Sequence, residues 1–554
     1  MNKLPTAVSG LAALHTMERE AVSLKRIICL LLCILLLASG CTAPGTLENT
    51  GPTESETQSQ TDRPAPPVPK GFGLTYVPEY GFNPYECVCI TNRPVFSLVY
   101  ESLFVMNNSF QPEPVLCERF AVSETGTTYL ITLCEGVTFS DGSPLTVKDA
   151  VASLKAARDS AYYGSRFSRV VDFSVKDERT LEISLEQPYE NLPLLLDVPI
   201  VKAGTQKEER PIGTGPYAFS EELTGLCLRR NQSWWQENRA PVEYDTILLT
   251  AAANPTEVRD SFEFGDTTLV CADLNSPNAV GYRCDYELWD CPTTTLQYLG
   301  FNLKSEFFSS RDVRGAVTHI IDRESLIVSV YKGFAKAAYL PCAPDSPLYD
   351  QDLAMLYSYD EEAAAAALRT TPVREESAGT LLVCTGDPVR LDMANRLAEI
   401  MSLAGLPMEV VAVDAETYRS RLERGKFDAF LGETRLSGNF DLSEFFRSGG
   451  SLCFGGIRSS DMEQLCVQAL ENSGNCYDLF RGVMENAYFC PLLFKSYAVM
   501  ANRGVIGILQ PAVDCVFHLP GGRSLADASV SYEEMIGGGE AETEPTENTE
   551  ENNP

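Results

Sequence analysis

The stretch TLLVCTGDPVRLDMANRLAEIMSLAGLPMEVVAVDAETYRSRLERGKFDAFL, residues 380–431, decides the fold class. Short apolar runs alternate in it with segments whose apolar residues recur at helical spacing, as at Met393, Leu397 and Ile400. The expected elements are strand 380–384, helix 390–403, strand 408–413, helix 416–424 and strand 427–431. Strands joined through helices by short connections pair in parallel with right-handed crossovers, so the stretch predicts an α/β lobe.

Ligand sites of such lobes lie at the carboxyl ends of the strands. Two segments of the stretch occupy such ends, namely Thr385-Gly386-Asp387 and the residues that follow Gly432. We therefore expect Thr385 to lie near a bound ligand.

The first half of the chain has a different pattern. Residues 128–133 alternate polar and apolar side chains, which predicts a strand, and residues 137–139 are expected to return as a second strand after a turn. Thr146 with Asp149 three residues later is a capping pair that predicts a helix start. Further helices are expected from Ser310 and from Arg323, the second ending at Gly333.

The N-terminal segment predicts export and a membrane tether. Lys25 and Arg26 precede the apolar run 27–38, and small residues lead up to Cys41. This arrangement resembles the lipobox of bacterial lipoproteins, in which the cysteine is acylated, and it implies a signal peptide at 1–40. An ordinary secretory signal or an uncleaved anchor is the alternative. Lipidation would hold the protein on the extracytoplasmic face of the cell membrane.

Two further segments are too polar to form a core. Residues 41–70 are rich in Thr, Ser, Glu, Gln and Pro, which predicts a disordered linker. Residues 537–554 open with glycines and continue with Glu, Thr, Asn and Pro, which predicts an acidic disordered tail. The 466 residues between these segments exceed what one core normally holds, so two or more lobes are expected.

The charge of the chain argues against a nucleic-acid partner. The formal net charge is −32, and removing residues 1–40, with four basic and two acidic groups, makes it −34. Nucleic-acid binding needs basic patches instead.

The chain has 18 cysteines, of which Cys29, Cys33 and Cys41 belong to the export segment. The other fifteen cannot all pair, and most lie in apolar segments, which favours buried free thiols over a disulfide framework. A local pair between Cys284 and Cys291 stays open. Cys87 and Cys89 are expected on a strand rather than on a metal, because no second Cys or His pair has zinc spacing.

Several sequence blocks occur together in one order. They are Tyr100–Leu103, Gly136–Val151 (GVTFSDGSPLTVKDAV), Pro211–Tyr217 (PIGTGPY), Asn231–Trp235, Phe301-Asn302, Arg311–Ala316, Ile321–Glu324 and Gly425–Asp428. Together they resemble the family 5 extracellular solute-binding proteins, the peptide- and nickel-binding subunits of ABC importers. The resemblance spans residues 71 to about 530.

The resemblance implies a fold of two hinged α/β lobes, like that of periplasmic binding proteins, with an extra subdomain in the first. Lobe one would comprise residues 71–295 and, on the chain's return, 500–536; lobe two would comprise 296–499. The lobes would close over a ligand, and an ABC permease would recognise the closed form.

Peptide binders of the family hold an extended ligand by strand-like hydrogen bonds and clamp its ammonium with an aspartate. On the matching loop, Arg435 to Phe446, that aspartate falls on Gly438, which leaves Asp441 as the nearest carboxylate. Asn439 belongs to the same loop. In lobe one, residues 80–84, with Tyr80 and Asn83, and residues 87–91 match the family's strands along the ligand.

Arg435 allows two interpretations. In one, it points to solvent and Asp441 caps a helix at 443–446. In the other, the site has lost its ammonium clamp and gained a guanidinium for carboxylate or phosphate, so that Arg435→Ala would abolish binding.

No Gly-x-Ser-x-Gly elbow or phosphate loop supports an enzyme. We therefore predict a monomeric, lipid-anchored solute-binding protein, without cofactor or bound metal, that passes a small peptide or peptide-like ligand to ABC permease and ATPase subunits. Binding of a nickel or metal chelate in the same fold is the alternative, as are a ligand-sensing surface lipoprotein without a transport role and a surface hydrolase.

Overall fold

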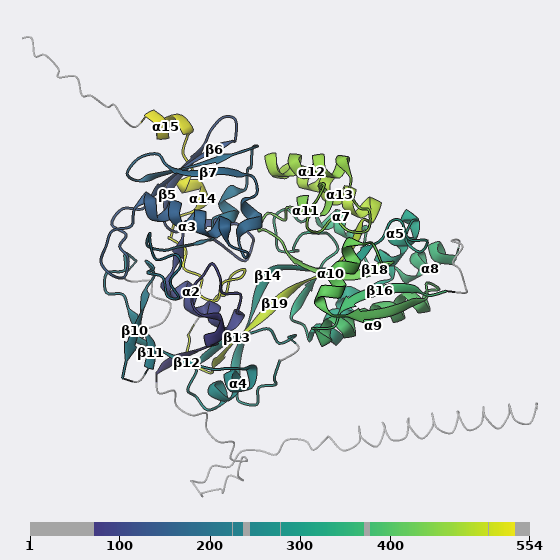
Figure 1. Ribbon diagram of the computed structural model, residues 1–554, viewed down its shortest axis with the longest axis horizontal. Helices are drawn as coiled ribbons and strands as arrows, with labels where there is room; N and C mark the ends of the chain where they lie inside the picture. The colour runs from purple at the N-terminus through teal and green to yellow at the C-terminus, as the bar shows by residue number, and fades with distance from the viewer. Residues whose placement is uncertain are drawn as a thin grey trace, which may run out of the picture. The chain divides into compact units, whose positions relative to one another are not determined.

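A mixed sheet of eleven strands runs through the protein (Figure 1). The computed structural model describes residues 71–223, 225–236, 244–276, 279–369, 377–507 and 509–537. The sheet order is β10 (Tyr217–Glu222), β11 (Gly225–Arg230), β12 (Thr246–Ala251), β1 (Phe72–Tyr76), β13 (Leu269–Ala272), β19 (Phe489–Asn502), β14 (Tyr286–Phe301), β18 (Ala429–Arg435), β16 (Gly379–Cys384) and β17 (Met408–Val413), with β15 (Ala335–Ala337) on β19.

The predictions for the N-terminus lie outside the described residues. These are the signal peptide at 1–40, the acylated Cys41 and the linker at 41–70; of the tail at 537–554, only the first residue is described. Among the described residues, no helix combines the length and apolar character that a membrane crossing requires.

Two long antiparallel strands, β14 and β19, join the two parts of the sheet. They pair from Tyr286 opposite Asn502 to Gly300 opposite Phe489, and the register shifts between Pro292 and Leu296. At one end β19 pairs with β13, and at the other β14 pairs with β18. The irregularity in β14 therefore lies where the chain passes between the two parts.

The predicted α/β stretch is confirmed. β16 is parallel to both β17 and β18, and α9 (Pro388–Leu403) and α10 (Ala415–Glu423) form the connections. Asp387 caps α9 by accepting the N–H groups of Val389 and Arg390. The third strand starts two residues later than predicted and continues to Arg435, because its final residues pair with β14.

A four-stranded antiparallel sheet forms in the first half, in the order β5 (Cys117–Val122), β6 (Thr128–Leu133), β8 (Thr180–Leu185) and β7 (Val170–Val175). The predicted capping box of Thr146 and Asp149 starts α3 (Val147–Asp159). The predicted strand at 137–139 is wrong. Only an isolated bridge joins Thr138 to Pro144, because Val137 and Phe139 bond across a tight turn to Leu145 and Ser143 instead of pairing with β6.

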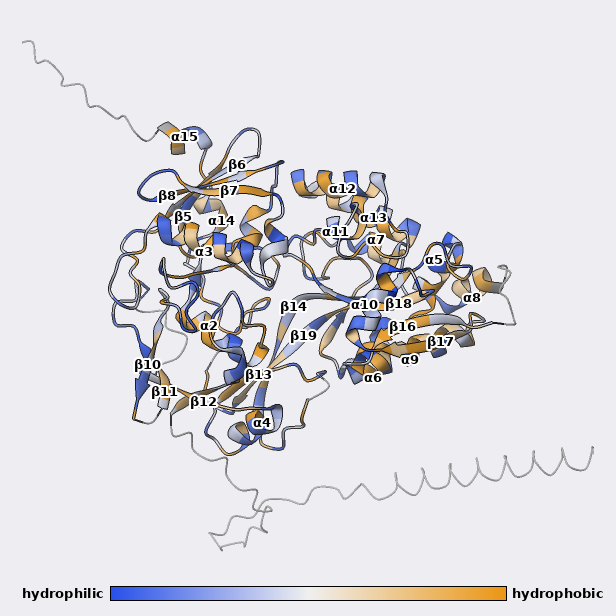
Figure 2. Ribbon diagram, in the orientation of Figure 1, coloured by the Kyte–Doolittle hydropathy of each residue, from blue (hydrophilic) through white to orange (hydrophobic). Residues whose placement is uncertain are grey.

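The helices predicted from Ser310 and Arg323 are present as α5 (Arg311–Ile320) and α6 (Arg323–Tyr331). Gly333 follows α6 with φ 87°, a left-handed conformation that glycine adopts without strain. The helices around the sheet carry both apolar and polar residues (Figure 2). Their apolar side chains complete the core, as Met393 and Leu397 of α9 do against Leu381 of β16.

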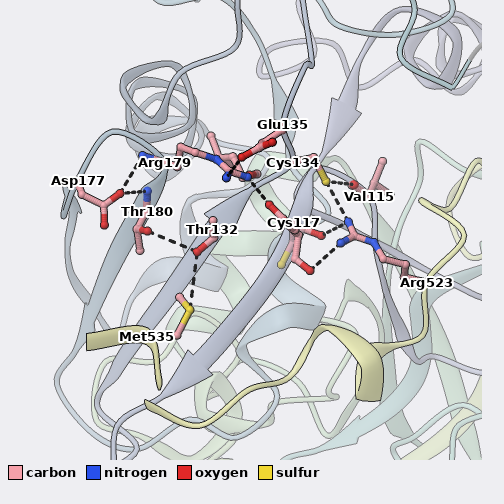
Figure 3. Close-up of polar contacts among 12 residues, drawn as sticks. Val115, Cys117, Thr132, Cys134, Glu135, Asp177, Arg179, Thr180, Arg523 and Met535 are labelled. Carbon is pink, nitrogen blue, oxygen red and sulfur yellow. Dashed lines mark hydrogen bonds and ion pairs between the residues drawn. The ribbon is translucent and has the colours of Figure 1, made fainter. Parts of the chain in front are cut away.

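The last described segment lies against the four-stranded sheet (Figure 3). Arg523 donates to the carbonyl oxygens of Glu118 and Cys117, at 2.7 and 2.8 Å, and to Cys134 Sγ at 2.9 Å. Ser529 forms a parallel bridge with Phe120. These contacts hold the C-terminal residues on the first half of the chain.

All fifteen described cysteines are free thiols, Cys284 and Cys291 included, in agreement with the prediction. The predicted strands at 80–84 and 87–91 are wrong. A 3₁₀ turn, η1 (Pro78–Tyr80), precedes the first, and another, η2 (Ile90–Asn92), closes the second. The N–H of Cys87 bonds to the carbonyl of Asn83 at 2.9 Å, so a turn uses the group that a strand would offer to a ligand.

Candidate functional site

Arg435 lies at the end of β18 and forms an ion pair with Asp514. The distance from Nη2 to Oδ2 is 2.9 Å, and the side chains are 24% and 7% exposed. The guanidinium also lies 4.5 Å from the centre of the Tyr162 ring. The interpretation in which Arg435 points to solvent is therefore wrong. Burial alone would raise the pKa of Asp514, but the charges of Arg435 and Arg93 hold that pKa below its ordinary value.

Arg93 brings a second guanidinium to the same ring. It is the first residue of α2 (Arg93–Val99), and its guanidinium carbon lies 4.9 Å from the centre of the Tyr162 ring. Its Nη1 donates to the carbonyl oxygen of Asp514 over a long 3.4 Å. Within the described part of the chain Arg93 forms no ion pair within 4.0 Å.

A cavity of about 120 Å³ is lined by these groups. Arg93, Arg435, Asp197 and Asp514 supply its charged walls. Asp197 is paired with Arg166, which lies outside the lining. The cavity thus joins residues from α2, from the end of β18 and from the C-terminal return of the chain.

Glu101 lines the same cavity and is almost fully buried. Its carboxylate accepts hydrogen bonds from Thr214 Oγ1 at 2.7 Å, from Trp234 Nε1 at 3.1 Å and from Trp235 Nε1 at 3.0 Å. Burial raises the pKa of Glu101 to about 7, although these three donors oppose the shift. The two tryptophans therefore hold this carboxylate through their indole N–H groups.

A second charged cluster lies where β16 and β18 end, as the α/β pattern predicts. Arg390 pairs with Glu433 at 2.9 Å, and its Nε lies 3.8 Å from Asp387. Lys495 Nζ lies 3.0 Å from Asp273 and 3.9 Å from Glu433. The cluster connects the strand ends on both sides of β19.

Thr385, two positions before Asp387, is exposed to solvent. Its N–H donates to the carbonyl oxygen of Val413 at 2.8 Å. The structure thus extends the strand pairing to Thr385 and brings its neighbour Asp387, rather than Thr385, to the charged groups.

The loop after Arg435 is packed against the first half of the chain. A Cβ on Gly438 would lie 2.6 Å from Met106 Sδ, so a side chain there would require the Met106 side chain to move. Asn439 Nδ2 donates to Tyr189 Oη at 2.8 Å. Asp441 accepts from the N–H and hydroxyl of Ser443, at 2.8 and 2.6 Å, and so satisfies the first N–H of α11 (Ser443–Phe446), although Leu442 occupies the N-cap position of that helix.

A second cavity, of about 780 Å³, opens beside the ends of β1, β12 and β13. Tyr80, 44% exposed, lines it together with Cys89, Asp273 and Tyr497. Asn83 is 5% exposed, and its amide donates to the carbonyls of residues 206 and 208. The amide of Asn83 therefore holds a loop in place.

Within the described residues no three His, Cys, Asp or Glu side chains gather closely enough to hold a metal ion.

Residues 111–451, more than half of the chain, match the family described as bacterial extracellular solute-binding proteins, family 5, middle. The chain belongs to this family. Family 5 proteins bind small solutes outside the cytoplasm and work with ABC permease and ATPase subunits.

Individual relatives of this family 5 protein are distant. The glutathione-binding protein GsiB of Escherichia coli K12 is 22% identical over 356 residues, which cover 62% of this chain and 69% of GsiB.

Solved structures of similar fold include NikZ of Campylobacter jejuni in complex with Ni(L-His) (20% identity, TM-score 0.60, 80% of this chain and 97% of NikZ). The ABC transporter substrate-binding protein CtaP of Listeria monocytogenes is 16% identical, with TM-score 0.64, over 78% of this chain and 94% of CtaP. The oligopeptide-binding protein AppA of Bacillus subtilis, solved with a nonapeptide, is 20% identical, with TM-score 0.56, over 79% of this chain and 95% of AppA. These likenesses confirm the predicted two-lobed α/β fold.

Sequence reasoning missed the charged residues of the smaller cavity, Arg93, Asp197 and Asp514, and those of the second charged cluster, Arg390, Glu433, Lys495 and Asp273. One signal was available for two of them. Lys495 interrupts a strand that is otherwise almost wholly apolar, and Glu433 follows the apolar run at residues 429–431. A charge in such a position is costly unless it is paired, and both residues are paired here.

Proposed function

We propose that the protein is the lipid-anchored receptor of an ABC importer and captures a peptide or peptide-like small solute between its lobes. The observation that carries the proposal is the cavity lined by Arg93, Asp197, Arg435 and Asp514. These residues come from segments of the chain on both sides of the two crossing strands. A ligand there would contact both lobes and favour their closed arrangement.

We assign the lobes as the sequence suggested, with residues 71–295 and 500–536 in lobe one and residues 296–499 in lobe two. The register shift between Pro292 and Leu296 supports this boundary, because an interrupted ladder bends more easily than a continuous one. The protein acts as a monomer and does not transform its ligand.

The ligands named for two similar proteins favour a peptide-like ligand for this chain as well. GsiB is a glutathione-binding protein, and AppA of Bacillus subtilis was solved with a nonapeptide. A nickel chelate is the second candidate, supported by the likeness to NikZ in complex with Ni(L-His). Such a chelate would be held through its organic part. A sensing lipoprotein that binds the same ligands without transport is the remaining alternative.

Uptake by living cells tests the proposed function whichever small solute the protein carries. Host cells with and without the gene are grown in a peptide-rich medium, and the solutes left in the medium are compared by mass spectrometry. We expect a class of small peptides to persist in the medium of the deletion strain and to be consumed again after complementation. Identical depletion by both strains would contradict a transport role.

The anchor is tested separately with Cys41→Ser. Acylation at this cysteine would hold the protein in the membrane fraction, because two or more acyl chains give stable anchoring. We expect the variant to appear in the soluble extracytoplasmic fraction with its fold intact. A variant that stays with the membrane would indicate an uncleaved anchor instead.

A further inference from the structure

Two donor groups in the wall of the smaller cavity are buried without a hydrogen-bond partner, namely Nε and Nη1 of Arg435. The hydroxyl of Tyr162, whose ring lies against the Arg435 guanidinium, is also buried without one. Arg435 uses only its Nη2, on Asp514, and Arg93 makes one long bond to a carbonyl. Buried polar groups are normally satisfied, so unused donors in such a place indicate a missing acceptor.

The charges around the cavity are unequal. Asp514 is paired with Arg435, and Asp197 is paired with Arg166. Arg93 is left with no carboxylate within 4.0 Å among the described residues. Glu101, the other acid of the lining, already accepts hydrogen bonds from three side chains. With Glu101 protonated, a form that burial favours by raising the pKa of this carboxyl to about 7, the two ion pairs and Arg93 together carry one excess positive charge.

We propose that this cavity binds a carboxylate of the solute, which accepts hydrogen bonds from Arg93 and from the free donors of Arg435. A guanidinium presents a planar fork that matches a carboxylate, and one negative charge balances the excess of one positive charge. A volume of about 120 Å³ suits the end of a ligand rather than a whole peptide. The inference rests on the proposed function and names the group by which the ligand is recognised.

The loop after Arg435, which would bind the amino end of a peptide, supports the same conclusion. Gly438 has no side chain, and the Met106 side chain occupies the space beside it. Asp441 uses its Oδ1 to accept from Ser443 at the start of α11. The solute is therefore recognised by its acid end, and its amino end is free to vary.

The test measures thermal unfolding of the full chain, purified with its own N-terminal segment, in the presence of four pools of the same tripeptides. The pools are unmodified, N-acetylated, C-amidated, and blocked at both ends. The two pools with a free carboxylate should raise the melting temperature. The two amidated pools should bind at least about tenfold more weakly, as expected for the loss of a charged hydrogen-bonding partner.

Arg93→Gln is the decisive variant, because no carboxylate is left unpaired when this side chain is neutralised. It should make the acid and amide pools equivalent. Arg419→Gln is the matched control, since its side chain is 80% exposed on α10 and should leave the discrimination unchanged. The double variant Arg435→Gln/Asp514→Asn removes the ion pair as a whole and should weaken binding of the acid pools only.

The outcomes separate this inference from the proposed function. Equal stabilisation by all four pools, or discrimination that survives in Arg93→Gln, would overturn the carboxylate site while leaving a peptide importer. No stabilisation by any pool would contradict peptide ligands. In that case, thermal stabilisation by succinate and glutarate is compared with stabilisation by their diamides, which tests the carboxylate site without a peptide. Stabilisation by these acids that Arg93→Gln abolishes would support the site, and its absence would overturn it.

Discussion

The Arg435 guanidinium lies 2.9 Å from the Asp514 carboxylate and joins the end of β18 to a segment 79 residues further along the chain. The pair fixes Arg435 in the cavity wall, although the carboxylate neutralises it. The neighbouring Arg93 therefore supplies the charge that a ligand can use. In the proposed recognition Arg435 thus has two roles, since Nη2 pairs with Asp514 and the other donors face the ligand beside Arg93.

We expect Arg435→Gln to lower the free energy of unfolding by about 2–3 kcal/mol, because it leaves the Asp514 carboxylate buried without its partner. Adding Asp514→Asn should restore most of that loss. Urea unfolding of the two variants checks this. If the single variant were as stable as the wild type, the pair would be a solvent-screened contact rather than a buried one.

Gly438→Asp should destabilise the protein by about 2–4 kcal/mol, because the new carboxylate would meet Met106 Sδ in a buried place without a donor. Gly386→Asp is the matched control, since its Cβ meets nothing within 4 Å. Met106→Ala should relieve part of the cost by making room. Equal melting temperatures for the Gly438 and Gly386 variants would show that the loop is not packed as described.

Glu101 should make stability depend on pH. The folded protein keeps this carboxyl protonated up to a pKa of about 7, whereas its ordinary value is 4.5. Between these values the folded state holds a proton that the unfolded state lacks, so the free energy of unfolding falls as pH rises, by up to about 3 kcal/mol. Glu101→Gln should flatten that slope. Urea unfolding at pH 5 and pH 7 measures it, and an unchanged slope would argue against the burial of this group.

The local pattern of residues 380–431 predicted that part of the fold well, because each strand and helix there is specified by its own periodicity. Strand β18 is longer than predicted because Thr434 and Arg435 pair with residues of β14, more than a hundred positions away in sequence. Cys87 and Cys89 have apolar neighbours that resemble a strand, yet the N–H of Cys87 bonds to Asn83 and the carbonyl of Cys89 accepts from Asn92, each within a turn. Tertiary contacts decided the first difference, and turns decided the second.

The candidate site was predictable only in part. Arg435 and the loop around Gly438 were identified because they depart from the family pattern. Arg93 and Asp514 are 421 positions apart in the sequence and share no motif, so only the fold brings them together. Their charges come from ordinary residue types, and nothing in the sequence distinguishes them from surface residues.

The central claim, that the cleft holds one small solute, is tested most directly by native mass spectrometry of the protein purified from its host's membranes in mild detergent. We predict a peak for the chain with one bound molecule of peptide size, or its appearance when the unmodified tripeptide pool is added. The bound molecule should leave on unfolding. A spectrum that shows only the bare chain, both before and after addition of peptides and dicarboxylates, would contradict the account.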